Sequence, residues 1–258
     1  MKGLLYKDWC TLTSRYKKNF TLLFVLYVGM AMLFDMPFML YALVFVLGLY
    51  VQSAVGFDEY SHWDVYAHTL PVRHSHIVGS KYILGGCAIL FGCVISMLAF
   101  AFSAGIVKGT MGYEEALIGT LTAATIATLY FSLSLPLTYK FGCDRARTVV
   151  MSAILLLVLG VFLLVTWVPQ HLLSPEATLK FEEWMNNAER FFGFRGPETI
   201  PDPATGAAVT MDVEYGSVVQ WAENPHFWWL IGGMVLFSVA IFVASWAIST
   251  AIYKKKQY

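Results

Sequence analysis

The segment from Phe57 to Tyr82 carries side chains that could do chemistry: carboxylates, histidines, a serine–lysine pair and several aromatic rings. His74 and His76 could be metal ligands, but no cysteine lies near them and no third ligand is obvious, so hydrogen bonding at an interface is the better interpretation. Residues 79–81, Gly-Ser-Lys, resemble the end of a phosphate-binding loop, yet His74 stands where that loop needs its upstream glycine. We therefore expect no metal site, no ATP site and no catalytic residues in this chain.

The apolar runs on either side of this segment are equally informative, because their cores contain no Asp, Glu, Lys, Arg or His. Ionisable groups are costly in lipid and mark proton relays or ion-coupled transport where they occur. Their absence argues against a proton- or sodium-coupled carrier and an intramembrane metalloprotease. A rhomboid-like serine protease would also need a histidine within a membrane span. A membrane-embedded enzyme is therefore a poor fit.

Apolar residues within the polar segment recur at three- and four-residue steps, as on one face of a helix. Pro71 disfavours helical geometry in the residue before it, so this short helix should end near Leu70. Two interpretations fit: a surface helix through which a partner protein binds a membrane channel, and a solvated loop with interfacial aromatic rings. The expected apolar face is Phe57, Tyr60, Trp63, Ala67 and Leu70, and the opposite face holds Asp58, Glu59, His62 and Thr69.

Composition sets the class of protein. Hydrophobic residues make up 58% of the chain and charged residues 13%, which is far from the balance of a soluble domain. Apolar runs of about 20 residues, enough to cross a bilayer, occur repeatedly. The formal net charge is zero, so no basic field suggests nucleic acid. None of the four cysteines lies in the long polar loop at residues 169–226, and we expect no disulfide framework.

The elements that position the polar segment are all expected to be helical, in one transmembrane domain that covers residues 1–258. Residues 1–19 have Leu5, Trp9 and Leu12 on one face with Lys7 and Asp8 turned away, which predicts a helix lying in the membrane interface. The six predicted spans are residues 20–34, 38–56, 82–107, 116–139, 148–168 and 227–253.

Orientation follows from the distribution of Lys and Arg. With six spans, 13 of the 17 basic residues fall on the side that holds both termini and residues 57–81. Positive charge is retained in the cytoplasm, so we expect cytoplasmic termini and a cytoplasmic 57–81 segment. The loop at residues 169–226, between the fifth and sixth spans, then lies outside.

This external loop should contain a helix over residues 175–192, started by a serine, a proline and an acidic residue. Prolines at 197, 201 and 203 predict an irregular continuation. The loop could be a lid, a receptor surface or a cover over the outer helix ends, and loops of this length are often functional.

The fourth predicted span offers only mild polarity. Thr120, Ala124 and Thr128 follow one another at four-residue steps, and small residues at this spacing let helices approach closely in lipid. The three residues could line a weakly polar translocation path, form a subunit interface, or simply pack inside the protein.

Several of these stretches resemble the ABC-2 type permeases of bacterial ABC exporters, in the branch that exports phenol-soluble modulins and antimicrobial peptides. The resemblance rests on the opening MKGLLYKDW, on six spans with cytoplasmic ends, and on TLPVRHSHIVGSKYIL at residues 69–84. Glu59 matches the family's acidic residue, residues 69–73 match the core of its signature, and Ile77, Val78 and residues 80–82 match its end.

The resemblance implies that a cytosolic ABC ATPase subunit carries the ATP and Mg²⁺, while this chain has no cofactor of its own. It implies a multi-pass permease of the bacterial plasma membrane that pairs with a second copy or a sister chain. The substrate would be a peptide or an amphipathic, lipid-like molecule. The ATPase would bind the coupling helix through Glu59, Trp63, Asp64, Tyr66, Leu70, Pro71 and Arg73.

A second hypothesis is a membrane sensor or immunity protein that binds an antimicrobial peptide through the external loop and transports nothing. Only the exporter must couple to a nucleotide-hydrolysing partner through residues 57–73.

Overall fold

The computed structural model describes residues 2–34, 36, 38–69, 71–106, 113–167, 171, 175–192, 194–201, 208–214 and 221–255. These residues form two compact units. The helical unit comprises residues 1–152 and 234–258, and the loop unit comprises residues 153–233.

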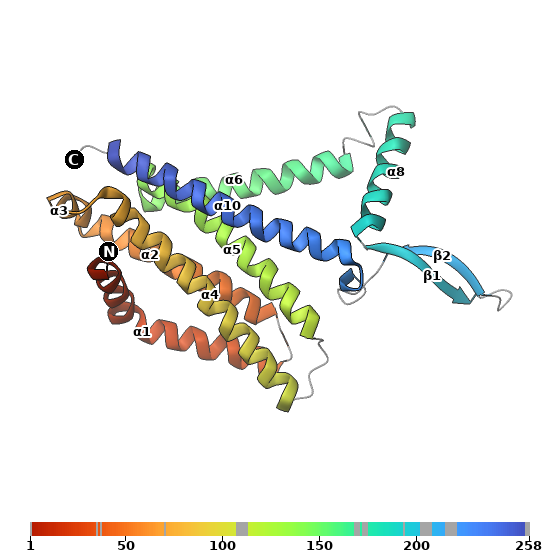
Figure 1. Cartoon of the computed structure of the whole chain (residues 1–258), viewed down its shortest axis with the longest axis horizontal. Helices are drawn as coiled ribbons and strands as arrows, with labels where there is room; N and C mark the ends of the chain where they lie inside the picture. The colour runs from red at the N-terminus through yellow and green to blue at the C-terminus, as the bar shows by residue number, and fades with distance from the viewer. Residues whose placement is uncertain are drawn as a thin grey trace. The chain divides into compact units, whose positions relative to one another are not determined.

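The helical unit is built around one central helix. Helix α2 (Phe38–Tyr60) packs against α1 (Lys2–Leu33), α4 (His74–Ile106) and α5 (Tyr113–Phe141), and the short α3 (Trp63–Thr69) follows it directly (Figure 1). The first part of α6 (Cys143–Phe162) and the last part of α10 (Pro225–Lys255) complete the unit.

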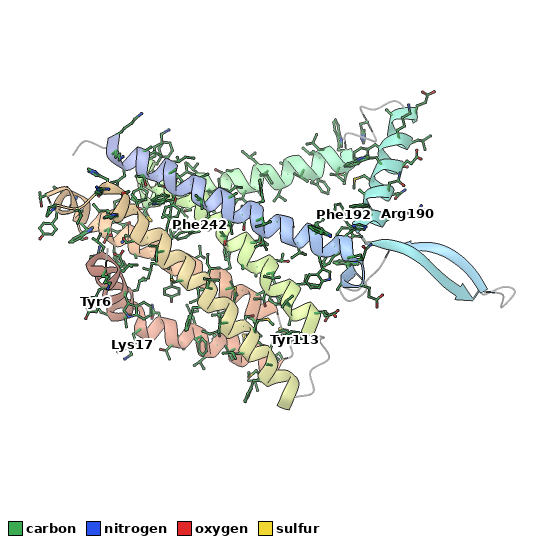
Figure 2. All side chains as sticks on the ribbon, in the orientation of Figure 1. Tyr6, Lys17, Tyr113, Arg190, Phe192 and Phe242 are labelled. Atoms are coloured by element: carbon green, nitrogen blue, oxygen red, sulfur yellow. The ribbon has the colours of Figure 1, made fainter. Side chains whose placement is uncertain are left out.

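Close contact between α4 and α5 depends on a glycine. A Cβ atom at Gly85 of α4 would collide with the ring of Phe131 on α5. Phe131 in turn packs against Tyr82 and stacks on Phe242 of α10, which is labelled in Figure 2. Without a side chain at position 85, the three helices can share this aromatic core, which is the close approach that small residues allow in membrane proteins.

Five helices are long and apolar enough to cross a membrane: α2, α4, α5, α6 with its π-helical continuation η1 (Leu163–Trp167), and α10. They correspond to the second to sixth predicted spans. The first predicted span lies in α1, whose apolar part is short and follows Lys17 and Lys18. The count of six spans therefore stays a prediction.

Helix α1 differs from the sequence prediction in one respect. Residues 2–33 form one continuous helix, whereas an interfacial helix over residues 1–19 and a separate span were expected. Figure 1 shows α1 bent, its first part turned relative to the rest, and Figure 2 labels Tyr6 and Lys17 along it. The expected turn of the chain between these two parts is a bend within one helix.

The loop unit contains α8 (Pro175–Phe192), which confirms the helix predicted there. The prediction of an irregular continuation is wrong: β1 (Arg195–Pro201) pairs antiparallel with β2 (Ala208–Glu214), with Arg195 opposite Glu214. Proline is compatible with an edge strand, and both strands of a two-stranded sheet are edges. The ring of Phe194 lies 5.2 Å from that of Trp221 and 5.9 Å from that of Phe227.

Candidate functional site

Four charged side chains meet where α1, α2 and α4 come together beside α3. The Nζ atom of Lys81 lies 2.6 Å from Asp8 Oδ1 and 2.5 Å from Asp58 Oδ2. The Nζ atom of Lys7 lies 2.6 Å from Asp58 Oδ1 and 3.0 Å from Asp8 Oδ1. Ser80 donates a weaker hydrogen bond to Asp8 Oδ2 at 3.4 Å. We call Lys7, Asp8, Asp58 and Lys81 the ion cluster.

The ion cluster is balanced, and three of its four side chains are buried. Asp8 and Lys81 are 2% and 3% exposed and Asp58 is 6% exposed, whereas the side chain of Lys7 is 26% exposed. Two ammonium groups face two carboxylates, so each charge has two opposite neighbours. Removing charge from water is costly unless such partners are present. The three helices are consequently held in one arrangement, since moving any of them would strand a buried charge.

Helix α3 is attached to this cluster through an aromatic ring. Lys7 Nζ lies 4.2 Å from the centroid of the Trp63 ring, a cation–π contact. Trp63 packs beside Tyr66 with ring centroids 5.2 Å apart, and Ala67 is buried against the core. His62 has a positive φ of 51°, so the left-handed residue between α2 and α3 turns the chain there.

The end of α2 is also fastened to the start of α6. Glu59 Oε2 accepts a hydrogen bond of 2.6 Å from the backbone N–H of Cys143, the first residue of α6. A carboxylate at a helix N-terminus satisfies an open donor and complements the helix dipole. Tyr60 donates to Asp144 Oδ2 at 3.0 Å. Gly142 precedes α6 with φ +87°, and a Cβ there would lie 2.5 Å from Glu59 Oε1.

The seven residues predicted to contact an ATPase fall into three groups. Glu59 is exposed and Trp63 is half-buried, and both make the contacts within the chain described above. Tyr66, at 56%, Pro71 and Arg73 are exposed. Leu70 and the side chain of Asp64 lie outside the described residues. Which of the seven contact a partner stays a prediction.

The prediction for the polar face of the first helical turns is wrong. Lys7 and Asp8 were expected to face away from the apolar side, yet both belong to the ion cluster and Asp8 is 2% exposed. Trp9, on the predicted apolar face, is 61% exposed, which agrees with a helix lying in the membrane interface. The physical reason is that α1 packs against α2 and α4. An interfacial helix was assumed to turn only its apolar side inward, but buried partner charges make an inward carboxylate favourable.

The ion cluster itself was missed by the sequence argument. Its signal was weak: Asp8 is the only acidic residue among the basic residues of the first nineteen positions, and Lys81 lies at the very start of an apolar run. Neither position identifies its partner, because residues 8, 58 and 81 are far apart in the sequence.

The three small residues predicted on the fourth span lie among contacts within the helical unit. Thr120 is buried, with its Oγ1 3.4 Å from Ser96 Oγ. Thr128 donates to the Ala124 carbonyl at 2.8 Å, and Ala124 packs against the cluster that contains Val44. Such bonds satisfy polar groups inside the chain.

A second polar cluster shares helix α4 with the ion cluster and is buried among apolar side chains. The Tyr82 hydroxyl is 2.6 Å from Ser245 Oγ and 2.8 Å from Ser249 Oγ, and Ser245 donates to the Ser132 carbonyl at 2.5 Å. Gln52 of α2 donates to Ser134 of α5. We call Tyr82, Ser132, Ser245 and Ser249 the hydroxyl cluster; it joins α4, α5 and α10 without any charge.

Across the part of the chain that the structure describes, no three His, Cys, Asp or Glu side chains gather as metal ligands. The His74 ring lies 5.9 Å from the ring of Tyr253.

Comparison with known proteins adds one finding. Residues 3–187 match a family model described as an ABC-2 family transporter protein. The matched region includes the whole ion cluster, α3 and the junction between α5 and α6. No curated protein and no solved structure matches the chain.

Proposed function

The chain belongs to the ABC-2 family of transporter proteins, and we propose that it is the permease subunit of an ATP-driven exporter in the bacterial plasma membrane. ATP would be bound and hydrolysed with Mg²⁺ on a separate cytosolic ABC ATPase subunit. Residues 57–81 would form the cytoplasmic coupling segment, with both termini on the same side. This orientation follows from the basic residues counted above.

The observation that carries the proposal is the attachment of α3. A force applied to α3 by a partner would pass through Trp63 to Lys7, and through Asp58 to Lys81 of α4. Glu59 would pass the same motion to the start of α6. Because buried charges must keep their partners, this linkage is stiff, and a movement of α3 becomes a movement of α1, α4 and α6 together.

The exposed part of the coupling segment supplies a contact surface for the ATPase. Tyr66, Pro71 and Arg73 are exposed, and aromatic and arginine side chains often dominate the energetics of protein interfaces. Glu59 would have two roles, because its carboxylate holds the start of α6 while its side chain is exposed to a partner.

Pairing with a second permease copy, identical or a sister chain, is part of the proposal. Within the helical unit, the first part of α6 leaves the apolar side chains of Val149 and Met151 40% and 51% exposed. Exposed apolar side chains on a membrane helix can serve a subunit interface. Six spans, counting the apolar part of α1, would then come from each copy.

The substrate we propose is a peptide or an amphipathic, lipid-like molecule. The membrane spans carry hydroxyl, small and aromatic side chains, and their cores contain no Asp, Glu, Lys, Arg or His. A path of this kind favours an amphipathic molecule over a small ion.

A second function is favoured by the loop unit. Helix α8 has exposed apolar residues, among them Leu179, Trp184 and Phe191. Exposed apolar surface on a folded extramembrane segment marks binding sites. A non-transporting sensor or immunity protein that binds an antimicrobial peptide through this unit is the alternative.

The decisive experiment is ATPase activity of the co-purified complex in lipid nanodiscs. The test variant is Tyr66→Ala with Arg73→Glu, and the matched control is Lys140→Glu, an exposed basic residue outside the coupling segment. We expect the double variant to lose most of the bound ATPase, on the order of tenfold, because interface residues of these types cost more than about 1 kcal/mol each. Full ATPase retention and unchanged hydrolysis in the double variant would exclude this coupling surface. The sensor function would then be favoured.

A further inference from the structure

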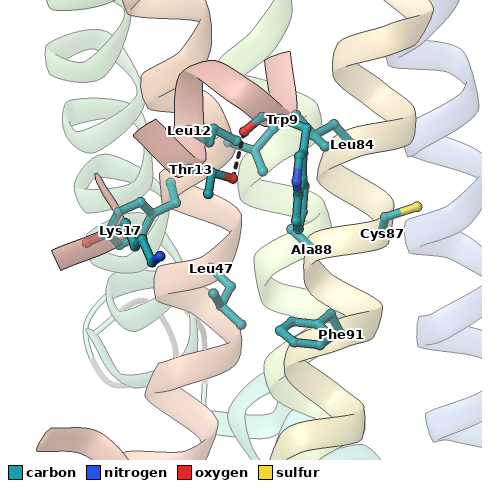
Figure 3. Close-up of a pocket in the computed structure, with 11 residues that line it drawn as sticks. Trp9, Leu12, Thr13, Lys17, Leu47, Leu84, Cys87, Ala88 and Phe91 are labelled. Atoms are coloured by element: carbon teal, nitrogen blue, oxygen red, sulfur yellow. Dashed lines mark hydrogen bonds between the residues drawn. The ribbon is translucent and has the colours of Figure 1, made fainter. Parts of the chain in front are cut away.

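A cavity of about 380 Å³ lies between the first half of α1, α2 and α4, entirely within the helical unit. Figure 3 shows it from the side: Trp9 and Leu12 approach from α1, Leu47 from α2, and Leu84 and Phe91 from α4. Its volume lies within the range of small-molecule sites, about 300–1,000 Å³. None of the functions proposed above uses it.

The wall of this cavity is apolar. It is formed mainly by aliphatic and aromatic side chains, and its one threonine, Thr13, already donates to the Trp9 carbonyl at 2.8 Å. An extended peptide needs partners for its backbone N–H and C=O groups when it leaves water. A hydrocarbon chain needs none. The lining therefore selects a hydrocarbon chain over a peptide backbone.

The mouth of the cavity has a different composition. Trp9 and Phe91 at its edge are exposed, so the cavity opens to the surroundings of the helices. Lys17 belongs to the lining and is itself exposed. A tryptophan and a lysine beside an apolar slot are the residues that settle at the headgroup level of a membrane. The ammonium group would complement an anionic headgroup.

We propose that this cavity binds one acyl chain of an anionic phospholipid, with Lys17 paired to the headgroup phosphate. The acyl chain would fill the space between the first part of α1 and helices α2 and α4. It is a bound component and not the transported substrate. The inference does not depend on the ATPase partner, so it can fail while the exporter proposal stands, and the reverse is equally true.

Site-specific photo-crosslinking tests the proposal on the full chain. The protein carries Phe91→p-benzoyl-phenylalanine and is reconstituted in nanodiscs with equal amounts of phosphatidylglycerol and phosphatidylcholine. Phe102, also exposed on α4 but outside the lining, takes the same photoreactive group as a control. Adducts are identified by mass spectrometry. We expect phosphatidylglycerol adducts to be enriched about fivefold at position 91, as one lysine near an anionic lipid would give, and not at position 102.

Two variants separate the headgroup contact from the slot. Lys17→Gln should abolish the enrichment at position 91, while Lys18→Gln, an exposed lysine that is not in the lining, should leave it intact. Ala88→Phe narrows the slot and should lower the yield of both lipid adducts at position 91 but not at 102. Because Lys17 is exposed, its variant should fold even if Ala88→Phe does not.

Three results would overturn the proposal: equal lipid mixtures at positions 91 and 102, equal effects of Lys17→Gln and Lys18→Gln, or a peptide adduct in place of a lipid adduct when position 91 is crosslinked in cells. The last result would assign the cavity to a peptide.

Discussion

The ion cluster and the hydroxyl cluster both join helices of the helical unit, but one is made of full charges and the other of neutral groups. The ion cluster links α1, α2 and α4 beside α3, at the end of the unit where Glu59 meets α6. The hydroxyl cluster links α4, α5 and α10 within apolar helices. The two clusters adjoin on α4, where Lys81 belongs to the ion cluster and the next residue, Tyr82, belongs to the hydroxyl cluster.

The difference shows what charged and neutral polar groups each need inside a membrane protein. A charged group that leaves water needs close opposite charges in place of the water. The four residues of the ion cluster meet this need near the ends of their helices. Hydroxyl groups need only a hydrogen-bond partner, which other hydroxyl groups and backbone carbonyls supply within apolar helices. We infer that the ion cluster specifies one arrangement, since any shift strands a charge. Hydroxyl groups can exchange partners when helices slide.

The largest effect is expected at the ion cluster. Lys81→Met would leave two buried carboxylates with one ammonium group and should destabilise the protein by about 3–5 kcal/mol. Thermal unfolding in detergent would measure the loss, with Lys140→Met as the exposed control. Adding Asp8→Leu to Lys81→Met restores charge balance and should recover part of the stability. A double variant less stable than Lys81→Met would contradict the assignment of charge balance as the cause.

A smaller effect is expected at the hydroxyl cluster. Tyr82→Phe removes the group that pairs with Ser245 and Ser249, and leaving buried partners unsatisfied costs about 1–3 kcal/mol. Tyr113→Phe, at an exposed tyrosine, serves as the control. If Tyr82→Phe proved more destabilising than Lys81→Met, the contrast between charged and neutral clusters would be wrong.

The smallest effect on stability is expected where α3 meets the ion cluster. Trp63→Leu keeps an apolar side chain and removes the cation–π contact with Lys7, worth about 0.5–1 kcal/mol at a partly exposed site. Its effect on coupling should be larger than its effect on stability. ATP hydrolysis by the complex should respond less to substrate, while the melting temperature falls by a few degrees at most. Unchanged coupling would show that α3 transmits force by another route.

Much of the fold could be predicted from the sequence because lipid imposes strict rules. Apolar runs of spanning length predicted α2, α4, α5, α6 and α10, and a serine–proline–acid start predicted α8. The β1–β2 hairpin was not predicted, because prolines near 197–203 indicate irregular backbone unless a partner strand is known.

The site was predicted only in part. The motif around residues 69–84 located the segment, and Trp63 and Glu59 were predicted there as contacts to an ATPase, not as attachments to α1 and α6. Their partners were not. Lys7 and Cys143 are far from them in the sequence, and helical periodicity gives the direction of a side chain on its own helix but not what lies opposite.

The sequence by itself determined that the chain is a multi-pass membrane protein of the ABC-2 family. The length of the apolar runs, the distribution of basic residues and the motif at residues 69–84 can each be recognised without knowing which residues are in contact. Only the tertiary structure decided that Asp8 and Lys81 are buried partners, that Glu59 holds the start of α6, and that α1, α2 and α4 enclose a cavity. These features depend on residues brought together by helix packing, and the energy of a buried charge depends on what surrounds it in space.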